Sequence, residues 1–264
     1  MINYLEVKQL LQKSLNNKVE KMVLVHDRKK GEYYRKQLVN ANITPSVSTD
    51  SHTEEDEFED ADYYLNPQQK AFVTSLYHEY KPWLNSLTTE ETNELKDYTS
   101  DNYVTINNHL RYIPSKYPLT PKRLNEIYHS VKAITSALNK SEVKTPLIVY
   151  RQVKGLDLLG KLKSCMESGG TWEDPAFMST TVIKDSFNVP ANKGAIHLVI
   201  DIPKGKGIGG FVKGLSEFPE EQEFLLNKGS RFEVKNIENP KTNQYVVHLK
   251  LVGRNTEDDV NYDL

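Results

Sequence analysis

The sequence predicts an α+β fold in which helices come first along the chain and β-strands follow. Before Pro146, apolar residues recur at three- and four-residue steps, which is the spacing of an amphipathic helix. After Pro146, they form short β-type runs separated by turn residues. Because helices and strands occupy separate parts of the chain, we expect an α+β domain and not a doubly wound parallel sheet.

Composition bounds the size and the partners of the protein. The chain has 264 residues, of which 38% are hydrophobic and 27% are charged. A chain of this length can bury a full core, so we expect one large domain or one domain with an appendage. The net charge of -2 gives no electrostatic reason to expect nucleic acid or an anionic membrane as a partner, because both favour a basic surface.

The first 62 residues differ in composition from the rest. Residues 45–62 contain few core-forming residues and a block of acidic ones, which predicts a solvated linker. This linker separates a small segment, residues 1–44, from a main domain, residues 63–264. Within the small segment we predict a helix over residues 2–15 and then a hairpin. A segment of roughly 40 residues folds poorly alone, so we expect it to dock on the main domain or on a delivery partner.

Helices open the main domain. Thr89 is predicted to cap a helix over residues 90–98, which has acidic residues in its first turn. A longer helix is predicted to begin at residues 119–121, where a threonine precedes Pro121. One side of this helix is apolar and is expected to pack against the core: Leu124, Ile127, Val131, Ile134 and Leu138.

Strands follow the long helix. Six are predicted, at residues 147–150, 177–182, 195–202, 221–226, 230–237 and 244–252. The glycine-rich stretch from Gly205 to Gly210 resembles a dinucleotide-binding loop in composition. Such a loop has to open a helix after a strand, and no helix is predicted here, so we reject a Rossmann fold.

The single cysteine and the hydropathy give no sign of secretion or membrane insertion. Cys165 cannot form an internal disulfide, and its surroundings indicate a half-buried helix position and not a nucleophile. The sequence has no run of about 18 apolar residues and no basic and then apolar zone at its start. We therefore expect a soluble protein without a signal peptide, which stays in the cytoplasm or is delivered into a target cell by a non-classical route.

Two glutamates are predicted to share one face of a strand. Residues two apart in a strand project to the same side, so Glu221 and Glu223 should lie together while Gln222 points away. Two adjacent carboxylates repel each other, which is tolerated more readily where the pair has a function. The alternative is a solvated strand face, because residues 55–57 in the linker have the same acidic spacing.

Other polar residues stand at the ends of apolar runs. Arg151 closes the run 147–150, a position from which a guanidinium can bind phosphate oxygens, although a surface ion pair is the alternative. The hydroxyls of residues 179–181 can brace an arginine or a carboxylate on a neighbouring strand, or they can be ordinary strand composition. Phe187, in a polar loop, can stack on a flat ring or fold onto the core.

These elements together resemble a known enzyme family. From about Asn66 to its end, the chain resembles the exoenzyme-type mono-ADP-ribosyltransferase domain of clostridial and bacillar toxins, including the enzymatic components of actin-modifying binary toxins. The resemblance rests on three site signatures and three further segments: 149–151, 177–181, 221–223, 97–111, 202–205 and 223–232. It implies two packed, mainly antiparallel sheets that form a cleft for NAD+, with helices to one side, and no metal.

The resemblance also implies a reaction and its residues. ADP-ribose would pass from NAD+ to an arginine of a protein substrate. Glu223 resembles the catalytic glutamate that stabilises the cationic ribose, and Glu221 resembles the acceptor-side glutamate of arginine-specific members. Ser179 and Arg151 complete the catalytic set, and Phe218 resembles the aromatic residue that recognises the target. The implied NAD+ contacts are Tyr98, Tyr103, Asn107, Arg151, Gln152, Ser179, Phe187, Lys193 and Glu223.

The sequence departs from the family pattern at two points. Thr181 stands where serine is usual, and no arginine follows Phe187 at the usual spacing, so Lys193 is the candidate replacement as a phosphate ligand. Two alternatives stay open: an NAD+ glycohydrolase that depletes NAD+, and a degenerate domain that only binds. The presence of Glu223 argues against the degenerate domain.

Overall fold

The computed structural model describes most of the predicted main domain. The described residues are 62, 64–115, 118–154, 156–184, 195–241 and 244–257. The predicted segment 1–44 and the predicted linker, except for Asp62, lie outside the described residues, as do Phe187 and Lys193. Predictions about them remain predictions.

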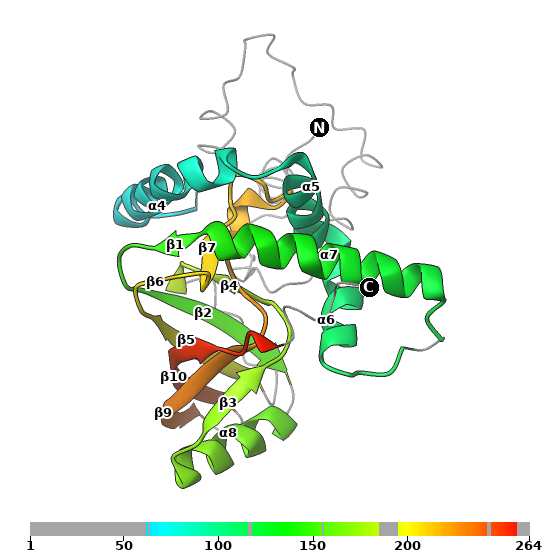
Figure 1. Ribbon diagram of the computed structural model, residues 1–264. Helices are drawn as coiled ribbons and strands as arrows, with labels where there is room; N and C mark the ends of the chain where they lie inside the picture. Colours follow the sequence, from blue (N-terminus) through cyan, green and yellow to red (C-terminus); the bar gives the residue numbers. More distant parts are fainter. Residues whose placement is uncertain are drawn as a thin grey trace, which may run out of the picture.

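The helices come first, as the sequence predicts. They are α4 (Pro67–Asn85), α5 (Thr89–Asp97), α6 (Tyr103–Leu110), α7 (Pro121–Lys140) and, later in the chain, α8 (Leu156–Ser168). In Figure 1, α4, α5 and α7 gather at one end of the strands and α8 lies at the other end. The helix-first order of the α+β prediction is confirmed, with α8 as one helix inserted among the strands. Cys165 is half-buried on α8, as expected.

Capping fixes where the early helices begin. Helix α7 starts where the sequence predicts, and Thr120 is its N-cap, whose hydroxyl accepts from the backbone N–H of Arg123. The prediction for α5 is wrong by one residue, because Thr88 and not Thr89 is the cap. Thr88 forms a capping box: its hydroxyl accepts from the N–H of Glu91, and the Glu91 carboxylate accepts from the N–H of Thr88. Of the two threonines, only Thr88 has a glutamate three residues later, which the capping box requires.

Ten strands are described, and most pair antiparallel. They are β1 (Glu142–Val143), β2 (Leu147–Lys154), β3 (Thr171–Asp174), β4 (Met178–Thr181), β5 (Ala195–Ile202), β6 (Gly205–Lys206), β7 (Gly209–Phe211), β8 (Glu223–Leu226), β9 (Ser230–Lys241) and β10 (Gln244–Arg254). Eight of them form one hydrogen-bonded order, β3-β9-β10-β5-β2-β4-β8-β7, and β1 pairs with β6. Within this order β5 and β10 are parallel neighbours. The antiparallel-rich sheet of the predicted fold is confirmed.

The two predicted sheets correspond to two parts of the eight-stranded order, which are joined at one point. Strands β3, β9, β10, β5 and β2 form one part, and β4, β8 and β7 form the other. The two parts join between β2 and β4 through a single residue pair, Tyr150 with Thr181. In Figure 1, β2 and β4 are both found below α7. This junction lies next to Arg151, so the site residues stand where the two parts meet.

Four predicted strands have clearly different bounds. Strand β2 runs beyond the apolar run to Lys154, because Arg151–Lys154 pair with Ala195–Leu198 of β5. Strand β8 begins at Glu223 and not at Glu221, because residues 219–221 form a turn of 3-10 helix. Strands β9 and β10 are longer than predicted, because they pair with each other along most of their length.

The core lies between the helices and the sheet. Trp83 of α4 is buried over Gly210 of β7, and its indole N–H donates to the carbonyl of Ala137 in α7 at 2.9 Å. A Cβ on Gly210 would approach the Trp83 ring to 2.5 Å, so this contact requires glycine. Burying such an aromatic side chain contributes about 2 kcal/mol or more to stability. The glycine-rich stretch thus forms short strands and opens no helix of its own, which agrees with our rejection of a Rossmann fold.

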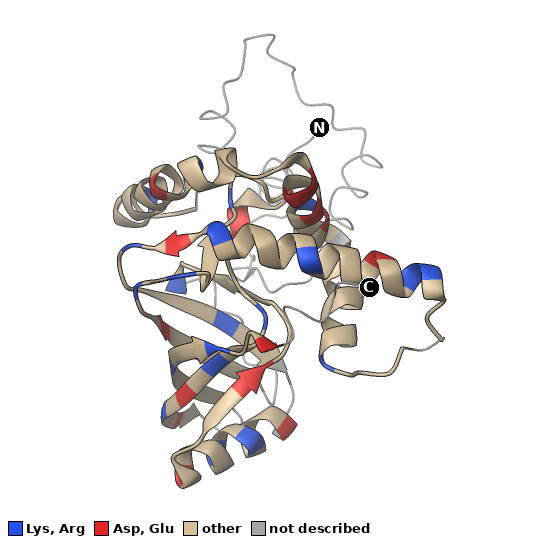
Figure 2. Cartoon of the chain, in the orientation of Figure 1, with Lys and Arg blue, Asp and Glu red and all other residues tan. Residues whose placement is uncertain are grey.

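Charged residues of both signs are spread over the helices and the strands (Figure 2). One local concentration of positive charge is a pocket beside α7 that includes Lys132, Lys140, Lys206 and Lys228 in its lining. Lys140 is ion-paired there with Glu91 at 2.6 Å. None of the predicted NAD+ contacts that the structure describes lines this pocket. Within the described ranges, no helix is long and apolar enough to cross a membrane.

Candidate functional site

Three neighbouring strands bring the three site signatures together. Strand β2 carries Arg151, β4 carries Ser179, and β8 begins with Glu223. Thr181 of β4 is paired with Glu223 on one side, and Tyr150 of β2 is paired with Thr181 on the other. The signatures are separated by tens of residues in the sequence and lie side by side in the sheet, as the prediction requires.

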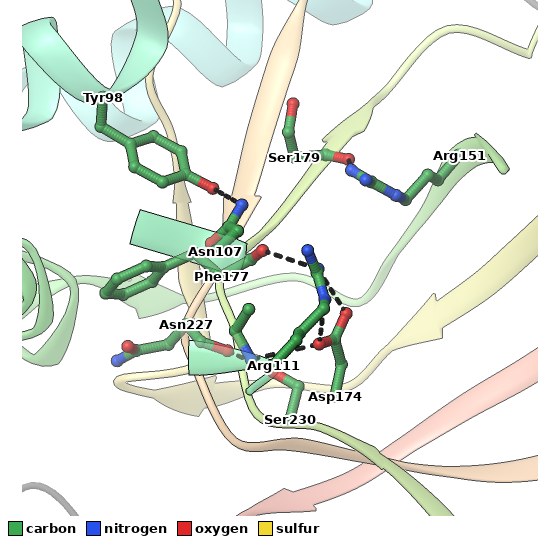
Figure 3. Close-up of polar contacts among 10 residues, drawn as sticks. Tyr98, Asn107, Arg111, Arg151, Asp174, Phe177, Ser179, Asn227 and Ser230 are labelled. Atoms are coloured by element: carbon green, nitrogen blue, oxygen red, sulfur yellow. Dashed lines mark hydrogen bonds and ion pairs between the residues drawn. The ribbon is translucent and has the colours of Figure 1, made fainter. Parts of the chain in front are cut away.

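Arg151 is fixed from the neighbouring strand. Its Nη1 donates a hydrogen bond to the carbonyl of Ser179, and Figure 3 shows the guanidinium directed toward that strand. Burial lowers the pKa of Arg151, and the positive charge of Arg111 lowers it further, while Asp174, Tyr98 and Glu223 act in the opposite direction. Two cations that repel each other at one place favour the binding of an anion between them.

Arg111 is the second cation of the site, and it is held by a carboxylate. Its Nε donates to Asp174 Oδ1 at 2.9 Å and its Nη2 donates to Asp174 Oδ2 at 2.8 Å, which is the two-pronged geometry shown in Figure 3. Burial acts to lower the pKa of Arg111, but the hydrogen bonds and charge of Asp174 outweigh it and raise this pKa. Arg111 therefore stays charged in a fixed orientation.

Sequence reasoning missed Arg111 and Asp174 as site residues. Arg111 lies in segment 97–111, which supports the family resemblance, and its place directly after α6 was the one available signal. Asp174 stands at the end of β3, and nothing in its neighbourhood in the sequence distinguishes it. Their pairing across 63 positions is a property of the fold.

The segment between α5 and α6 carries the predicted tyrosine contacts. Tyr98–Asn102 forms a π-helix, a rare element that often occurs at functional sites. The Tyr98 hydroxyl accepts from Asn107 Nδ2 at 2.9 Å, and its ring meets that of Tyr103 edge-on. Burial raises the pKa of Tyr98, as does the negative charge of Glu223, so the phenol stays neutral. Tyr98 and Asn107 are thus placed near Glu223 and both guanidiniums.

Two predicted NAD+ contacts have a buried polar atom without a partner. Asn107 is 5% exposed, and its Oδ1 has no hydrogen-bond partner among the described residues. The same holds for Nε2 of Gln152, which follows Arg151 on β2. Leaving such an atom unsatisfied is unfavourable, so an arrangement of this kind is typical of a site that receives a polar ligand.

The two glutamates do not share a strand face, which corrects the prediction. Glu221 ends the 3-10 turn Pro219–Glu221, Gln222 has a left-handed backbone with φ 50°, and Glu223 begins β8. Glu223 is 1% exposed, whereas Glu221 is half-buried. The left-handed residue between them breaks the strand alternation on which the prediction relied. One carboxylate is therefore buried beside Arg151, and the other lies on the preceding turn.

The hydroxyl signature braces the site differently from the prediction. It is the backbone carbonyl of Ser179 that accepts from Arg151. The Thr180 hydroxyl donates to the carbonyl of Phe224 on β8 at 2.5 Å, and the Thr181 hydroxyl accepts from the N–H of Ile183. Thr180 thus ties β4 to the strand that carries Glu223. Phe218 is half-buried three residues before Glu221, on the same turn.

Comparison with known proteins shows which family the chain belongs to. The profile of the family described as ADP-ribosyltransferase exoenzyme matches residues 77–253. The chain belongs to this exoenzyme family. The match includes every site signature, from Tyr98 to Glu223. Within the part of the chain that the structure describes, no group of three or more His, Cys, Asp or Glu could hold a metal ion.

A curated relative of this exoenzyme domain is the NAD(+)–arginine ADP-ribosyltransferase EFV of Enterococcus faecalis. The two are 29% identical over 162 residues, which is 60% of this chain and 31% of the relative. The chain thus spans about a third of the length of the curated relative that it matches.

Solved structures of ADP-ribosylating proteins share the fold of the exoenzyme domain. Plx2a of Paenibacillus larvae aligns with a TM-score of 0.55 and 21% identity, over 70% of this chain and 97% of that one. BECa, an ADP-ribosylating toxin of a C. perfringens binary enterotoxin solved with NADH, aligns with a TM-score of 0.57 and 23% identity, over 71% and 49% of the two chains. HopU1 of Pseudomonas syringae aligns with a TM-score of 0.53 and 22% identity, over 76% and 89%.

Proposed function

We propose that this domain is an NAD+–arginine mono-ADP-ribosyltransferase of the toxin type. The observation that carries the proposal is the position of Glu223, buried at the start of β8 beside Arg151 and Tyr98, with a second carboxylate two residues earlier. The name of the E. faecalis relative supports NAD+ as substrate and arginine as acceptor, and the NADH-bound structure of BECa, which has the same fold, supports a nicotinamide dinucleotide as ligand.

In this proposal the two guanidiniums bind the pyrophosphate. Arg151 is oriented by the Ser179 carbonyl and Arg111 by Asp174. Because each arginine is already held by an acceptor, little side-chain freedom is lost when the phosphates bind. The unsatisfied atoms of Asn107 and Gln152 would supply further polar contacts to NAD+.

Glu223 would act on the ribose. As the bond between C1′ and the nicotinamide nitrogen breaks, its electron pair leaves with neutral nicotinamide and positive charge develops on the sugar. A carboxylate that is fixed and excluded from water stabilises that charge strongly, because little solvent screens it. Glu223 meets these conditions at 1% exposure.

Glu221 would act on the acceptor. A guanidinium is a poor nucleophile, and a carboxylate that orients it and accepts its proton as the new N–C1′ bond forms makes the attack easier. The half-buried turn that carries Glu221 also carries Phe218, which we propose contacts the target protein. We propose delivery into a target cell, with residues 1–44 as the candidate contact for a delivery partner.

The direct test is to incubate the full chain with labelled NAD+ and a cell lysate, and to identify modified residues by mass spectrometry. The proposal expects ADP-ribose on protein arginine. Release of free ADP-ribose without protein modification would instead identify an NAD+ glycohydrolase, and no turnover at all would identify a domain that only binds.

Arg151→Lys is expected to weaken NAD+ binding by about tenfold or more, because an ammonium cannot replace a two-pronged phosphate contact. Isothermal titration calorimetry with NAD+ measures this directly. The matched control is Arg231→Lys on β9, where the arginine is exposed and its carboxylate partner Glu173 is 4.0 Å away. If the Arg151→Lys affinity equals that of the control, Arg151 has only a structural role.

A further inference from the structure

A buried ion pair stands beside the glutamate turn and has no part in the mechanism proposed so far. Lys213 lies two residues after β7 and is 2% exposed, and Asp62 precedes α4 and is 6% exposed. Lys213 Nζ donates to Asp62 Oδ1 at 2.5 Å. Burying two charges costs much desolvation energy, so such a pair is weak as a source of stability and can instead serve to fix one particular geometry.

Both members of the pair bind Gln222, the residue between the two glutamates. Lys213 Nζ donates to Gln222 Oε1 at 3.3 Å, and Gln222 Nε2 donates to Asp62 Oδ1 at 2.6 Å. Gln222 is fully buried and adopts φ 50° and ψ 47°, a conformation that residues with a Cβ rarely adopt. With both ends of its amide engaged, the side chain holds the backbone in this conformation.

The two glutamates depend on Gln222 to different degrees. Glu223 is inside the sheet: it pairs with Thr181, and its carbonyl accepts from the N–H of Val212 at 3.0 Å. Glu221 is outside the sheet, and its N–H donates to the carbonyl of Phe218 within the turn. The direction of the Glu221 side chain therefore follows from the turn that Gln222 closes.

The chain preceding α4 contacts the same turn a second time. The Tyr64 hydroxyl donates a hydrogen bond to the carbonyl of Glu220, the residue before Glu221. Asp62 and Tyr64 thus hold the chain at Gln222 and at Glu220, on either side of Glu221, from more than 150 positions away in the sequence.

We propose that Asp62 and Lys213 are positioning residues for Glu221, which they orient through Gln222. The pair holds the turn so that the Glu221 carboxylate meets the acceptor guanidinium, while Glu223 is held by the sheet. The acceptor half of the site thereby depends on the segment that precedes α4, and the NAD+-cleaving half does not. This inference rests on the proposed transferase function.

The test uses the full chain and three variants: Asp62→Asn, Lys213→Met and the double variant. For each, the kcat and KM of NAD+ hydrolysis and the rate of ADP-ribose transfer to a small guanidino acceptor are measured. Because small displacements of a catalytic group can cost up to about 100-fold, we expect the ratio of transfer to hydrolysis to fall about tenfold in each single variant. The KM for NAD+ should change less than about twofold, because the phosphate contacts are elsewhere.

The double variant distinguishes a shared action from two separate ones. If both residues act through Gln222, their effects are not additive, and the double variant should lose about tenfold and not about 100-fold in the ratio. A single variant leaves one buried charge unpaired and can fail to fold. In that case the double variant, which leaves none, and Gln222→Met, which removes both hydrogen bonds of the side-chain amide, test the inference through the same transfer-to-hydrolysis ratio.

Glu91→Gln is the matched control. This substitution removes the charge of Glu91, which forms a 2.6 Å ion pair with Lys140 between α5 and α7. It should lower the Tm without changing the transfer-to-hydrolysis ratio. An unchanged ratio in folded Asp62, Lys213 and Gln222 variants overturns the inference and leaves the proposed function intact. A wild-type chain that hydrolyses NAD+ and modifies no guanidino acceptor overturns the proposed function, and the inference with it.

Discussion

Glu223→Gln is expected to abolish both ADP-ribose transfer and NAD+ hydrolysis while leaving the fold intact. Glutamine has nearly the same size, so the packing at the start of β8 is retained, but the negative charge that we propose faces the ribose is lost. Removing one fixed electrostatic stabiliser of a transition state costs about 10²-fold or more in kcat. The rate of nicotinamide release measures this loss, and circular dichroism with a thermal melt checks the fold.

Two controls give this result its meaning. Glu142→Gln makes the same substitution at an exposed position on β1 and should keep wild-type activity. NAD+ affinity of Glu223→Gln should stay near wild type, because we propose that Arg111 and Arg151 make the phosphate contacts. Turnover by Glu223→Gln close to that of Glu142→Gln would contradict the mechanism.

The parts of the fold that depend on local sequence could be predicted from it. The cap at Thr120 and the apolar steps of α7 are signals within a few residues of each other, and the helix has the expected start. Strand β5 has the predicted bounds, Ala195–Ile202, because its apolar run ends at turn residues on both sides. The site signatures at Arg151, Ser179 and Glu223 are each local patterns, and the sheet brings them together.

The parts that depend on distant contacts could not be predicted. The strand at Glu221 was predicted two residues too long because the left-handed conformation of Gln222 is held by Asp62, 160 positions away. Likewise Arg111 acquires its place in the site from Asp174, whose carboxylate arrives from β3. Phe187 and Lys193 lie outside the described residues, so their roles remain predictions.

Glu221→Gln is expected to separate transfer from hydrolysis. Transfer to a protein arginine or to a small guanidino compound should fall by about 10²-fold or more, because the acceptor loses the carboxylate that orients it and accepts its proton. Hydrolysis should remain within a few-fold of wild type, because water needs no such partner and Glu223 is unchanged. Parallel assays of protein-bound and free ADP-ribose from one reaction measure both rates, with Glu142→Gln as the control.

The separation follows from where the structure places the two carboxylates. Glu223 is buried in the sheet beside Arg151, and Glu221 is half-buried on the preceding turn, so removing the charge of Glu221 leaves the surroundings of the proposed ribose site largely as they are. If both activities fall together to the Glu223→Gln level, Glu221 takes part in cleavage itself and has no separate acceptor role. If the wild-type enzyme modifies asparagine, cysteine or threonine, the link between a glutamate at this position and arginine specificity fails for this chain, whatever the variant does.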